Sequence, residues 1–516
     1  MRAFQRLISV ALLLSGWSAI VGIAPCEAKT PSSDLRSAEK IRQICAKQPL
    51  VSSVVGVFAV TMEGDTLACI NPGLKLVPAS NVKLVTTGLA LGLLGPDFRF
   101  ETRIAYSGSI TDGVLKGDIY IVGGGDPTTG ANVPIVPQVT NTFSKWKKLL
   151  SDAGIRSIEG RIIGDPRFFA DSTPENLGWT YDDLGTNYGA GSTGLNFFEN
   201  AQNFLITPGA KVGEAPQISP RYPNTPWMRY ENLAATGAAR SANTVYYINT
   251  PLAPQAMFAG SFPVDRKGYT LECSNRFPSL TCADYFRSYL EDSGISVKGG
   301  ASDIAPDGMV RELPGIVAKD HALSVESLTV LGSTYSPTLF EIIAQTNSES
   351  DNFFAETLFK MMSRQRFGLT DYDSCVKAAN MALNEMGLKT KGVCQIFDGS
   401  GLSRKNYISA DFFVNFLRLM RSSEHGDLYL RSLPSPGKRG TLEYMFPKES
   451  KEFRSRIYMK SGSMNGVRCY SGYILPQDGK PEHTIVFSFL TNNLVADSWM
   501  VNPSIDSIIK ALASEN

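Results

Sequence analysis

The sequence predicts an α+β fold in which a large, mostly β insertion divides one domain into two halves. Two observations lead to this prediction. Residues 29–100 contain the patterns of a helix, a strand hairpin and an apolar helix, and residues 321–516 contain those of helices, then strands and a closing helix. Between them, residues 101–320 alternate short β-like pieces with clusters of Gly, Pro and Asn. Helices and strands grouped in this way indicate one α+β domain, and the change of composition marks an insertion of one or two subdomains.

The chain begins with the pattern of an export signal. Arg2 and Arg6 precede an apolar stretch at 7–23, and small residues follow as far as Ala28. We expect residues 1–28 to be a signal peptide, with a retained membrane anchor as the alternative, although the stretch is short for a spanning helix. The mature protein is therefore expected to be periplasmic or extracytoplasmic, with no stable membrane span once the signal is cleaved.

Hydrophobic periodicity predicts the elements of the first half. The pattern at 37–45 is helical. Alternating runs at 54–60 and 66–70, separated by a turn, predict a hairpin. A second, more apolar helix is predicted over 78–93, and Gly95-Pro96 is a typical helix end.

The insertion and the second half together show clear strand and helix patterns. β-like pieces of the insertion lie at 102–106, 117–122 and 245–249. The last two strands of the second half are joined across 477–480, which has the composition of a hairpin turn. The predicted elements of this half are helices at 336–346, 352–362 and 410–420, strands at 456–460, 467–475 and 484–491, and a closing helix at 505–512.

Length and charge limit the class of protein. The chain has 516 residues, more than one hydrophobic core usually serves, so two or three domains are expected. Its composition, 43% hydrophobic and 19% charged, is that of an ordinary globular protein. Removing residues 1–28, which hold Arg2, Arg6 and Glu27, leaves 48 basic and 48 acidic side chains. A chain with no net charge gives no electrostatic reason to expect nucleic acid or an anionic membrane as partner.

Seven cysteines remain beyond residue 28, and export would permit disulfides. An odd number leaves at least one thiol unpaired, and Cys469 is the candidate because it lies in a strand pattern. The sequence has neither a Cys-x-x-Cys pair nor His-Glu-x-x-His, so no metal and no other cofactor is expected. Local spacing suggests three pairs: Cys45 with Cys69, Cys273 with Cys282, and Cys375 with Cys394.

Three short motifs, far apart in the sequence, carry the candidate chemistry. They are Ser80-x-x-Lys83 at the start of an apolar helix, Ser350-Asp351-Asn352 between helices, and Lys460-Ser461-Gly462 on a strand. Ser-x-x-Lys alone has little value because it recurs, for example at Ser144-x-x-Lys147. Lys-[Ser/Thr]-Gly occurs once, and the order and setting of the three motifs make them informative. Since one motif precedes the insertion and two follow it, we expect a site assembled from both halves.

A serine hydroxyl is a weak nucleophile until a base takes its proton. The three histidines of the chain each stand alone among polar or loop residues, and no Gly-x-Ser-x-Gly elbow occurs, so a histidine-based triad is poorly supported. A lysine can serve as the base when burial or a neighbouring cation lowers its pKa. Ser80 and Lys83 are three residues apart on one helix and therefore lie within hydrogen-bond reach. Lys460 is expected to supply the second cation, and its strand a backbone N–H for an oxyanion.

With the three motifs in this order, the chain resembles the class C low-molecular-mass penicillin-binding proteins. These form the D-alanyl-D-alanine carboxypeptidase/endopeptidase family with a large insertion after the first motif, and the similarity runs over nearly the whole mature chain. One departure is Ser461, where the family usually has Thr; a hydroxyl is retained, so we expect altered fit and not lost activity. Further strings that carry the resemblance lie at 117–120, 122–127, 178–183, 398–404 and 440–442.

The resemblance implies a serine transpeptidase/β-lactamase-like domain, an antiparallel sheet with helices, split by the insertion into residues 29–100 and 321–516. It implies that Ser80 is the acylated nucleophile and Lys83 its general base. Ser350 and Asn352 would relay protons and hold the substrate amide, and Lys460 would bind the terminal carboxylate. No cofactor is implied.

The resemblance also implies how the substrate is held. The Lys-Ser-Gly strand would bind the extended peptide, and the backbone N–H groups of Ser80 and Ser463 would form the oxyanion hole. Asp183 and Arg404 match family positions that line a pocket for the amino end of a diamino-acid side chain. The alternatives are an ordinary loop carboxylate at Asp183 and a turn-stabilising one at Asp398. The predicted substrate-binding residues are Ser461, Gly462, Ser463, Asp183, Arg404 and Asp398.

The expected function is that of a hydrolase that cleaves D-Ala-D-Ala ends, or D-amino-acid cross-links, of peptidoglycan through an acyl-Ser80 intermediate. The expected partners are peptidoglycan stem peptides and cross-links, and β-lactam antibiotics as slow covalent substrates. One alternative is a serine β-lactamase, although the chain shows no obvious dedicated carboxylate for a deacylating water. Another is a non-catalytic protein that binds the cell wall, although the key Ser, Lys and Asn residues are all present.

Overall fold

The computed structural model describes residues 36–169, 174–312 and 317–515. The predicted signal peptide at 1–28 lies outside these ranges. Within them, no helix is both long and apolar enough to cross a bilayer.

The described chain forms two compact units. The split unit, as we call it, contains the chain as far as Phe98, then Thr338–Gly368, then the chain from Tyr372 onward. The inserted unit contains Arg99–Pro337 together with Leu369–Asp371.

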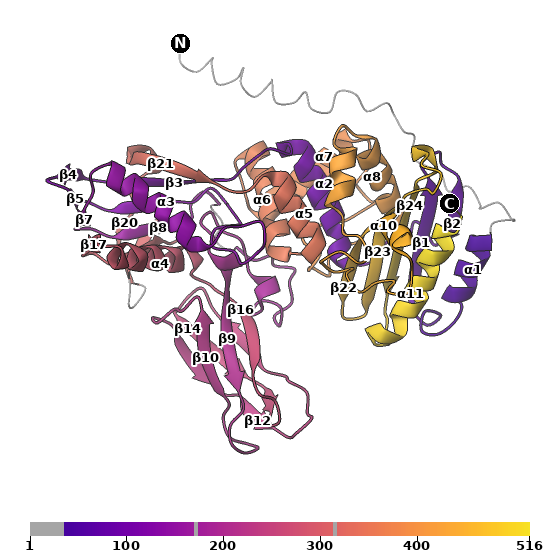
Figure 1. Ribbon diagram of the computed structural model, residues 1–516, viewed down its shortest axis with the longest axis horizontal. Helices are drawn as coiled ribbons and strands as arrows, with labels where there is room; N and C mark the ends of the chain where they lie inside the picture. The colour runs from indigo at the N-terminus through magenta and orange to yellow at the C-terminus, as the bar shows by residue number, and fades with distance from the viewer. Residues whose placement is uncertain (1–35, 170–173, 313–316, 516) are drawn as a thin grey trace, which may run out of the picture. The chain divides into compact units, whose positions relative to one another are not determined.

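The inserted unit extends beyond the predicted limit at residue 320. The reason is strand β21 (Thr329–Tyr335), which pairs antiparallel with β3 (Glu101–Tyr106) near the start of the same unit (Figure 1). The first and the last strand of the inserted unit therefore lie side by side, and both belong to its main sheet.

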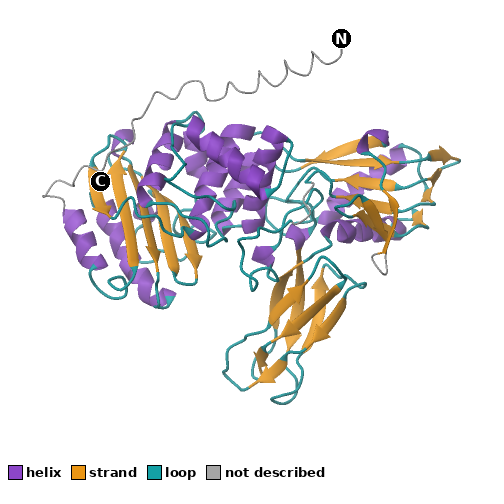
Figure 2. Ribbon diagram, turned by 180° about the vertical axis from the view of Figure 1, so that it is seen from behind, coloured by secondary structure: helices purple, strands orange, loops and turns teal. Residues whose placement is uncertain are grey.

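A five-stranded antiparallel sheet forms the centre of the split unit, in the order β2-β1-β24-β23-β22 (Figures 1 and 2). Strand β1 precedes the insertion and β24 follows it, yet they pair along their full length, from Val54 opposite Asn492 to Thr61 opposite Ile485. All of β24 is buried, as expected for a central strand. The two halves share one sheet, which confirms the predicted α+β class. The strands are β1 Val54–Thr61, β2 Thr66–Ile70, β22 Ile457–Met464, β23 Val467–Ile474 and β24 Ile485–Asn492.

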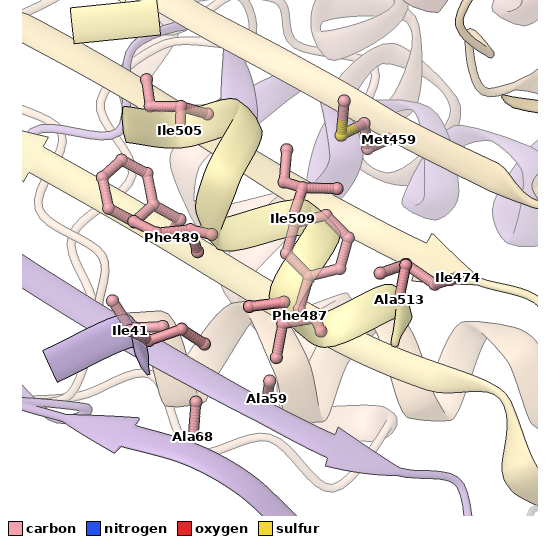
Figure 3. Packing of buried hydrophobic residues seen from close by; sticks show 14 of the residues in the cluster. Ile41, Ala59, Ala68, Met459, Ile474, Phe487, Phe489, Ile505, Ile509 and Ala513 are labelled. Atoms are coloured by element: carbon pink, nitrogen blue, oxygen red, sulfur yellow. The ribbon is translucent and has the colours of Figure 1, made fainter. Parts of the chain in front are cut away.

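Two helices from opposite ends of the described chain, α1 (Arg36–Cys45) and α11 (Ser498–Ala513), pack against each other and against one face of this sheet. Ile41 of α1 and Ile509 of α11 join Phe487 of β24 in a single buried cluster (Figure 3). The opposite face packs against α8 (Ala410–Ser422). Successive side chains of a strand alternate between faces, so Tyr473 points away from this cluster, and its hydroxyl donates to the Leu417 carbonyl at 2.7 Å.

Several of the other helices of the unit pack against α2 (Val82–Leu94), which follows a short 3-10 turn, η2 (Ala79–Asn81). The residues of α2 as far as Leu91 are buried on every side, the pattern of a helix inside a domain. Gly88 permits the close approach of α8, since a Cβ there would lie 2.7 Å from the Phe416 ring. The remaining helices of the unit are α5 Leu339–Glu349, α6 Asn352–Phe367, α7 Tyr372–Glu385, α9 Gly426–Ser432 and α10 Lys451–Ser455.

The inserted unit is built on a mixed seven-stranded sheet, in the order β20-β19-β18-β8-β6-β3-β21. Helix α4 packs on β8 and β18, and α3 packs on α4 and β21, around a core in which Trp146 meets Phe286 edge to face. Smaller sheets surround a separate core that contains Phe204 and Phe258. The remaining elements of the unit are β4 Ser109–Thr111, β5 Val114–Lys116, β6 Ile119–Val122, α3 Val139–Asp152, β7 Ser157–Ile158, β8 Ile162–Asp165, β9 Ala201–Thr207, β10 Gln217–Tyr222, β11 Arg229–Asn232, β12 Ala235–Gly237, β13 Tyr246–Asn249, β14 Gln255–Ala259, β15 Ser261–Pro263, β16 Tyr269–Ser274, α4 Pro278–Asp292, β17 Ser296–Val297, β18 Ala301–Ile304, β19 Met309–Glu312 and β20 Val317–His321.

The three disulfides suggested by cysteine spacing do not form. Cys273 and Cys282 are free thiols buried in different hydrophobic cores: Cys273 lies in the core with Phe204 and Phe258, and Cys282, on α4, lies in the core with Trp146 and Phe286. Cys45, Cys69 and Cys394 are free as well, so neither of the other two pairs exists. Cys469, predicted to be unpaired, is a buried free thiol that faces the Val77 carbonyl.

Phe487 lies in the buried cluster between the sheet and α11, so replacing it tests this packing. Replacing Phe487 by Ala is expected to lower the free energy of unfolding of the split unit by about 3–5 kcal/mol, because it empties a fully buried ring position. Denaturant unfolding followed by circular dichroism measures the loss. Val495→Ala at a fully exposed position is the control, expected to change stability by less than about 0.5 kcal/mol. Equal losses in both variants would contradict the assigned core.

Candidate active site

The structure brings Ser80 and Lys83 together at the start of α2. Ser80 lies in η2 and is half-buried, and Lys83 lies in the first turn of α2 and is fully buried. The Lys83 Nζ donates a hydrogen bond to the Ser80 Oγ at 3.0 Å. The residue before the serine, Ala79, has a φ of 47°, in the left-handed region that a side chain disfavours. The surrounding structure therefore holds this turn in its conformation.

Asn352 and Ser400 accept the other two hydrogen bonds of the Lys83 ammonium. Its Nζ lies 2.6 Å from the Asn352 Oδ1 and 2.7 Å from the Ser400 carbonyl oxygen. An ammonium has three donors, and all three are used, as burial of a charged group requires. The amine is therefore held in one position against the serine hydroxyl.

The second motif owes its shape to a junction of two helices. Ser350 caps the C-terminus of α5 with a left-handed φ of 61°, and Asp351 caps the N-terminus of α6 by accepting from the Phe354 N–H at 2.9 Å. Asn352 is then the first residue of α6. A carboxylate is a preferred N-cap, which explains on structural grounds why the middle residue of the motif is Asp.

Burial lowers the pKa of Lys83 from its usual range to about 8, and the carboxylates of Asp398, Glu356 and Asp351 limit the fall. A pKa of about 8 leaves roughly a tenth of the amine in the free-base form at pH 7. Lys83 is therefore able to accept a proton from a neighbouring hydroxyl near neutral pH.

The third motif lies on β22, at the edge of the described sheet. Lys460 is fully buried, and its Nζ donates to the Ser461 carbonyl at 2.9 Å. Burial, and then the charge of Lys83, hold the pKa of Lys460 well below its usual range. Ser461 is half-buried and Ser463 exposed at the end of the strand.

Gly462 lets β22 approach the serine turn. A Cβ at this position would lie 2.6 Å from the Pro78 carbonyl and 3.2 Å from the Asn81 N–H nitrogen. The Asn81 side chain donates to the Ser471 Oγ of β23 at 2.8 Å and ties the turn to the sheet. The requirement for glycine in the Lys-Ser-Gly motif is therefore one of space.

The loop at 398–404 lies against the same turn. Gly401 has a φ of 85°, and a Cβ there would lie 1.9 Å from the Ala79 carbonyl. Asp398 is fully buried and accepts from the N–H groups of Gly401 and Ser403 and from the Asn406 side chain, at 2.6–2.8 Å. This placement favours the turn-stabilising alternative for Asp398, and its contact with substrate stays a prediction. Arg404 is exposed and donates to the Asn465 carbonyl in the turn after β22, at 3.2 Å.

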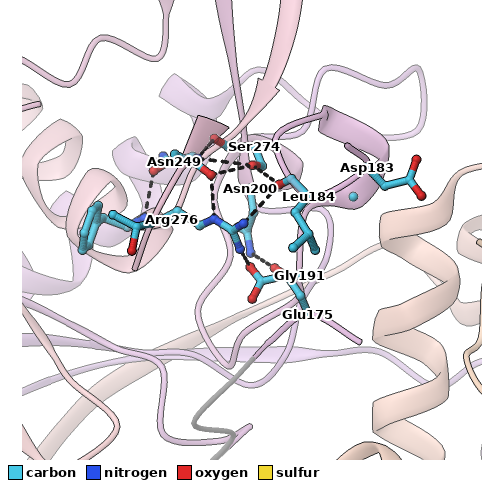
Figure 4. Close-up of polar contacts among 12 residues, drawn as sticks. Glu175, Asp183, Leu184, Gly191, Asn200, Asn249, Ser274 and Arg276 are labelled. Atoms are coloured by element: carbon cyan, nitrogen blue, oxygen red, sulfur yellow. Dashed lines mark hydrogen bonds and ion pairs between the residues drawn. The ribbon is translucent and has the colours of Figure 1, made fainter. Parts of the chain in front are cut away.

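Asp183 belongs to the inserted unit, where its own loop holds it. The Thr180 Oγ1 donates to the Asp183 Oδ2 at 2.6 Å. The next residue, Leu184, is fixed through its carbonyl, which accepts from Arg276 at 3.1 Å and from the Ser274 Oγ at 2.8 Å. Arg276 also forms an ion pair with Glu175, so that a buried polar cluster anchors the loop while the Asp183 side chain points away from it (Figure 4).

Comparison with known proteins identifies the family. The chain matches the model of the D-Ala-D-Ala carboxypeptidase 3 (S13) family over residues 37–514. The chain belongs to this family. The resemblance drawn from the three motifs is thereby confirmed, and so, at the level of the family, is the function expected from it, that of a serine-type D-Ala-D-Ala carboxypeptidase.

The S13 relatives match over most of their length. The D-alanyl-D-alanine carboxypeptidase of Actinomadura sp. (strain R39) is 28% identical, with 92% of this chain and 84% of that protein covered. The D-alanyl-D-alanine carboxypeptidase DacB of Haemophilus influenzae is 21% identical, with 85% and 86% covered. The crystal structure of penicillin binding protein 4 (dacB) from Haemophilus influenzae has a TM-score of 0.76 at 20% identity and covers 92% of this chain and 98% of its own. This last likeness supports the fold.

Two residues around Lys83 were not predicted from the three motifs. One is Ser400, which contributes only its backbone carbonyl, and the other is Glu356, a fully buried carboxylate on α6. A signal for Glu356 existed, because it is the one charged residue in the otherwise apolar run 353–359. A lone charge in such a run is rarely buried unless it has partners.

The space around Gly462 predicts the effect of adding one methyl group. Gly462→Ala is expected to lower the rate of D-alanine release from a D-Ala-D-Ala peptide roughly tenfold or more, because β22 must move away from the Ser80 turn. Gly73→Ala is the matched control, since a Cβ there meets its nearest neighbour, the Asp411 Oδ2, at an ordinary 3.7 Å. If Gly462→Ala kept the rate of the control, the close approach would not matter for activity.

Proposed function

We propose that this S13 enzyme removes the terminal D-alanine from peptidoglycan stem peptides through an ester on Ser80, in the periplasm or another extracytoplasmic compartment. The observation that supports the proposal is the contact between the Lys83 Nζ and the Ser80 Oγ at 3.0 Å, made by a buried amine whose pKa is lowered to about 8. An amine so placed is a general base for the neighbouring hydroxyl.

In the proposed acylation step, the Ser80 Oγ attacks the carbonyl carbon between the last two D-alanines while its proton passes to the Lys83 Nζ. The C–N bond then breaks, and the leaving D-alanine amine takes up the proton held by Lys83, relayed through the Ser350 hydroxyl, while the Asn352 side chain holds the substrate amide. Water hydrolyses the resulting ester and returns Ser80 to its free form. The backbone N–H groups of Ser80 and Ser463 stabilise the negative oxygen that forms in each step.

The edge position of β22 supports a role in binding the substrate. An extended peptide adds to a sheet edge through main-chain hydrogen bonds, and Ser461, Gly462 and Ser463 lie at the end of that edge. Lys460 is a buried amine, and a terminal carboxylate would provide a counter-charge that favours its ammonium form. A β-lactam has a carbonyl and a carboxylate similarly placed, and we propose that it acylates Ser80 as a slow substrate.

Cross-links of peptidoglycan are proposed as further substrates, since they contain the same D,D-peptide bond. In this proposal the Asp183 carboxylate recognises the amino group of a diamino-acid side chain. The placement of Asp183 on an anchored loop supports a fixed recognition residue. Export of the enzyme follows from the predicted signal at 1–28.

Covalent labelling tests the nucleophile. A fluorescent penicillin is expected to label the wild type and not Ser80→Ala, because the variant has no hydroxyl to acylate. Ser144→Ala removes an exposed serine with the same Ser-x-x-Lys spacing on α3 and is expected to label fully. Label on Ser80→Ala, or none on the wild type, would overturn the assignment. Digestion of purified peptidoglycan then distinguishes released D-alanine from cleaved cross-links.

The pH dependence of acylation tests the base. Only the free-base form of Lys83 accepts the serine proton, and its fraction rises with pH until the pKa of about 8 is passed. The rate of penicillin acylation is therefore expected to rise about tenfold per pH unit between pH 5 and 7 and to level off near pH 8. Stopped-flow measurement across this range checks the expectation, and a rate independent of pH would exclude Lys83 as the base.

A further inference from the structure

We propose that Glu356 is a positioning residue of this reaction, whose buried carboxylate both holds the Ser400 carbonyl against Lys83 and sets the proton affinity of the Lys83 amine. The proposal rests on the proposed function, in which Lys83 is the base. The Glu356 carboxylate does not itself contact Ser80, so its proposed effect passes through Lys83 and Ser400.

The carboxylate of Glu356 is fully buried and is bound at both oxygens. Its Oε1 accepts from the Ser400 N–H at 2.7 Å. Its Oε2 accepts from the Gly399 N–H at 3.2 Å and from the Tyr372 hydroxyl at 3.1 Å. The carboxylate therefore holds two consecutive peptide groups of the loop at 398–404, and Tyr372 of α7 fixes the carboxylate in turn.

Ser400 joins Glu356 to Lys83 through its own backbone. Its N–H donates to the Glu356 carboxylate, and its carbonyl accepts from the Lys83 ammonium at 2.7 Å. The peptide cannot move easily, because the Gly399 carbonyl accepts from the Thr86 Oγ1 of α2 at 2.6 Å. On the other side, a Cβ at Gly399 would lie 2.6 Å from the Phe359 Cβ of α6. A shift of the carboxylate would therefore move the acceptor that positions the base.

The charged groups near Glu356 and the Lys83 amine come from three segments: the loop at 398–404, α2, and α6 with its cap. Asp398 lies in the loop that Glu356 holds, Lys83 lies on α2, and Asp351 caps α6. On the remaining side, the Lys360 ammonium of α6 lies 5.3 Å from the centre of the Tyr372 ring. Three carboxylates, those of Asp398, Glu356 and Asp351, thus act on one buried amine.

These charges make Glu356 sensitive to pH in the range where Lys83 titrates. Burial, and then the charge of Asp398, raise the pKa of Glu356 to about 7. The negative charges of Asp398 and Glu356 in turn raise the pKa of Lys83 against the effect of burial. Removing the charge of Glu356 is therefore expected to lower the pKa of Lys83, so that the free base exists at lower pH.

A merely structural role and a charge role give different results. Loss of packing would reduce the acylation rate by the same factor at every pH. Loss of charge would move the acidic limb, the part of the pH–rate profile in which the rate rises with pH, toward lower pH. This shift is expected whether or not the plateau rate also changes. The position of the limb, relative to the plateau of the same variant, is the readout that separates them.

The test is the rate of acylation by a fluorescent penicillin between pH 5 and 9, for the full-length wild type and Glu356→Gln. The pH of half-maximal rate is expected to lie about half a pH unit lower in the variant, with the difference greatest near and above pH 7, where the Glu356 carboxylate of the wild type is ionised. Glu424→Gln, the same change at an exposed residue after α8, is the control and is expected to keep the wild-type limb. A lowered plateau with an unmoved limb would overturn the proposal.

Tyr372→Phe provides a second variant if Glu356→Gln fails to fold, as thermal unfolding would reveal. It keeps the carboxylate but removes one donor that stabilises its charge, so the limb is expected to move in the same direction by a smaller amount. A limb identical to that of the wild type would again overturn the proposal. Failure of the proposed function is distinguishable, because the wild type itself would then show no Ser80-dependent labelling.

Discussion

The buried ammonium of Lys83 is the constraint on which the architecture of the split unit depends. An amine taken out of water loses its hydration, and only hydrogen bonds and opposite charges inside the protein replace it. Ser80, Asn352 and Ser400 each provide one acceptor, and they come from segments that are far apart in the chain. Satisfying one amine therefore determines where the serine turn, the start of α6 and the loop at 398–404 meet. The carboxylates behind that loop complete the arrangement, because they keep the amine from losing its proton altogether.

Local sequence patterns were sufficient to predict the features that depend on residues close together in the chain. Alternating apolar residues predicted β1 and β2, and Gly95-Pro96 marked the end of α2. The contact of Ser80 with Lys83 was predictable because residues three apart on a helix are neighbours. The Ser400 carbonyl was not, since every residue has a carbonyl and only the folded loop brings this one close. The disulfides predicted from cysteine spacing were wrong, because Cys273 and Cys282 are near in sequence but are buried in different cores.

The place of the insertion explains how the site tolerates it. The chain leaves the split unit at Phe98 and returns at Thr338, and these ends are adjacent, since the Leu339 N–H donates to the Phe98 carbonyl at 2.8 Å. An insertion between neighbouring points adds little loop entropy, whatever its length. It also follows the complete helix α2, so the turn that carries Ser80 and Lys83 is left intact.

The pairing of β1 with β24 has a consequence for the order in which the molecule matures. The central strand of the sheet is Ile485–Asn492, close to the carboxyl end, while the serine turn lies within the first hundred residues. A nascent polypeptide thus carries Ser80 long before the strand that completes the surrounding sheet has been synthesised.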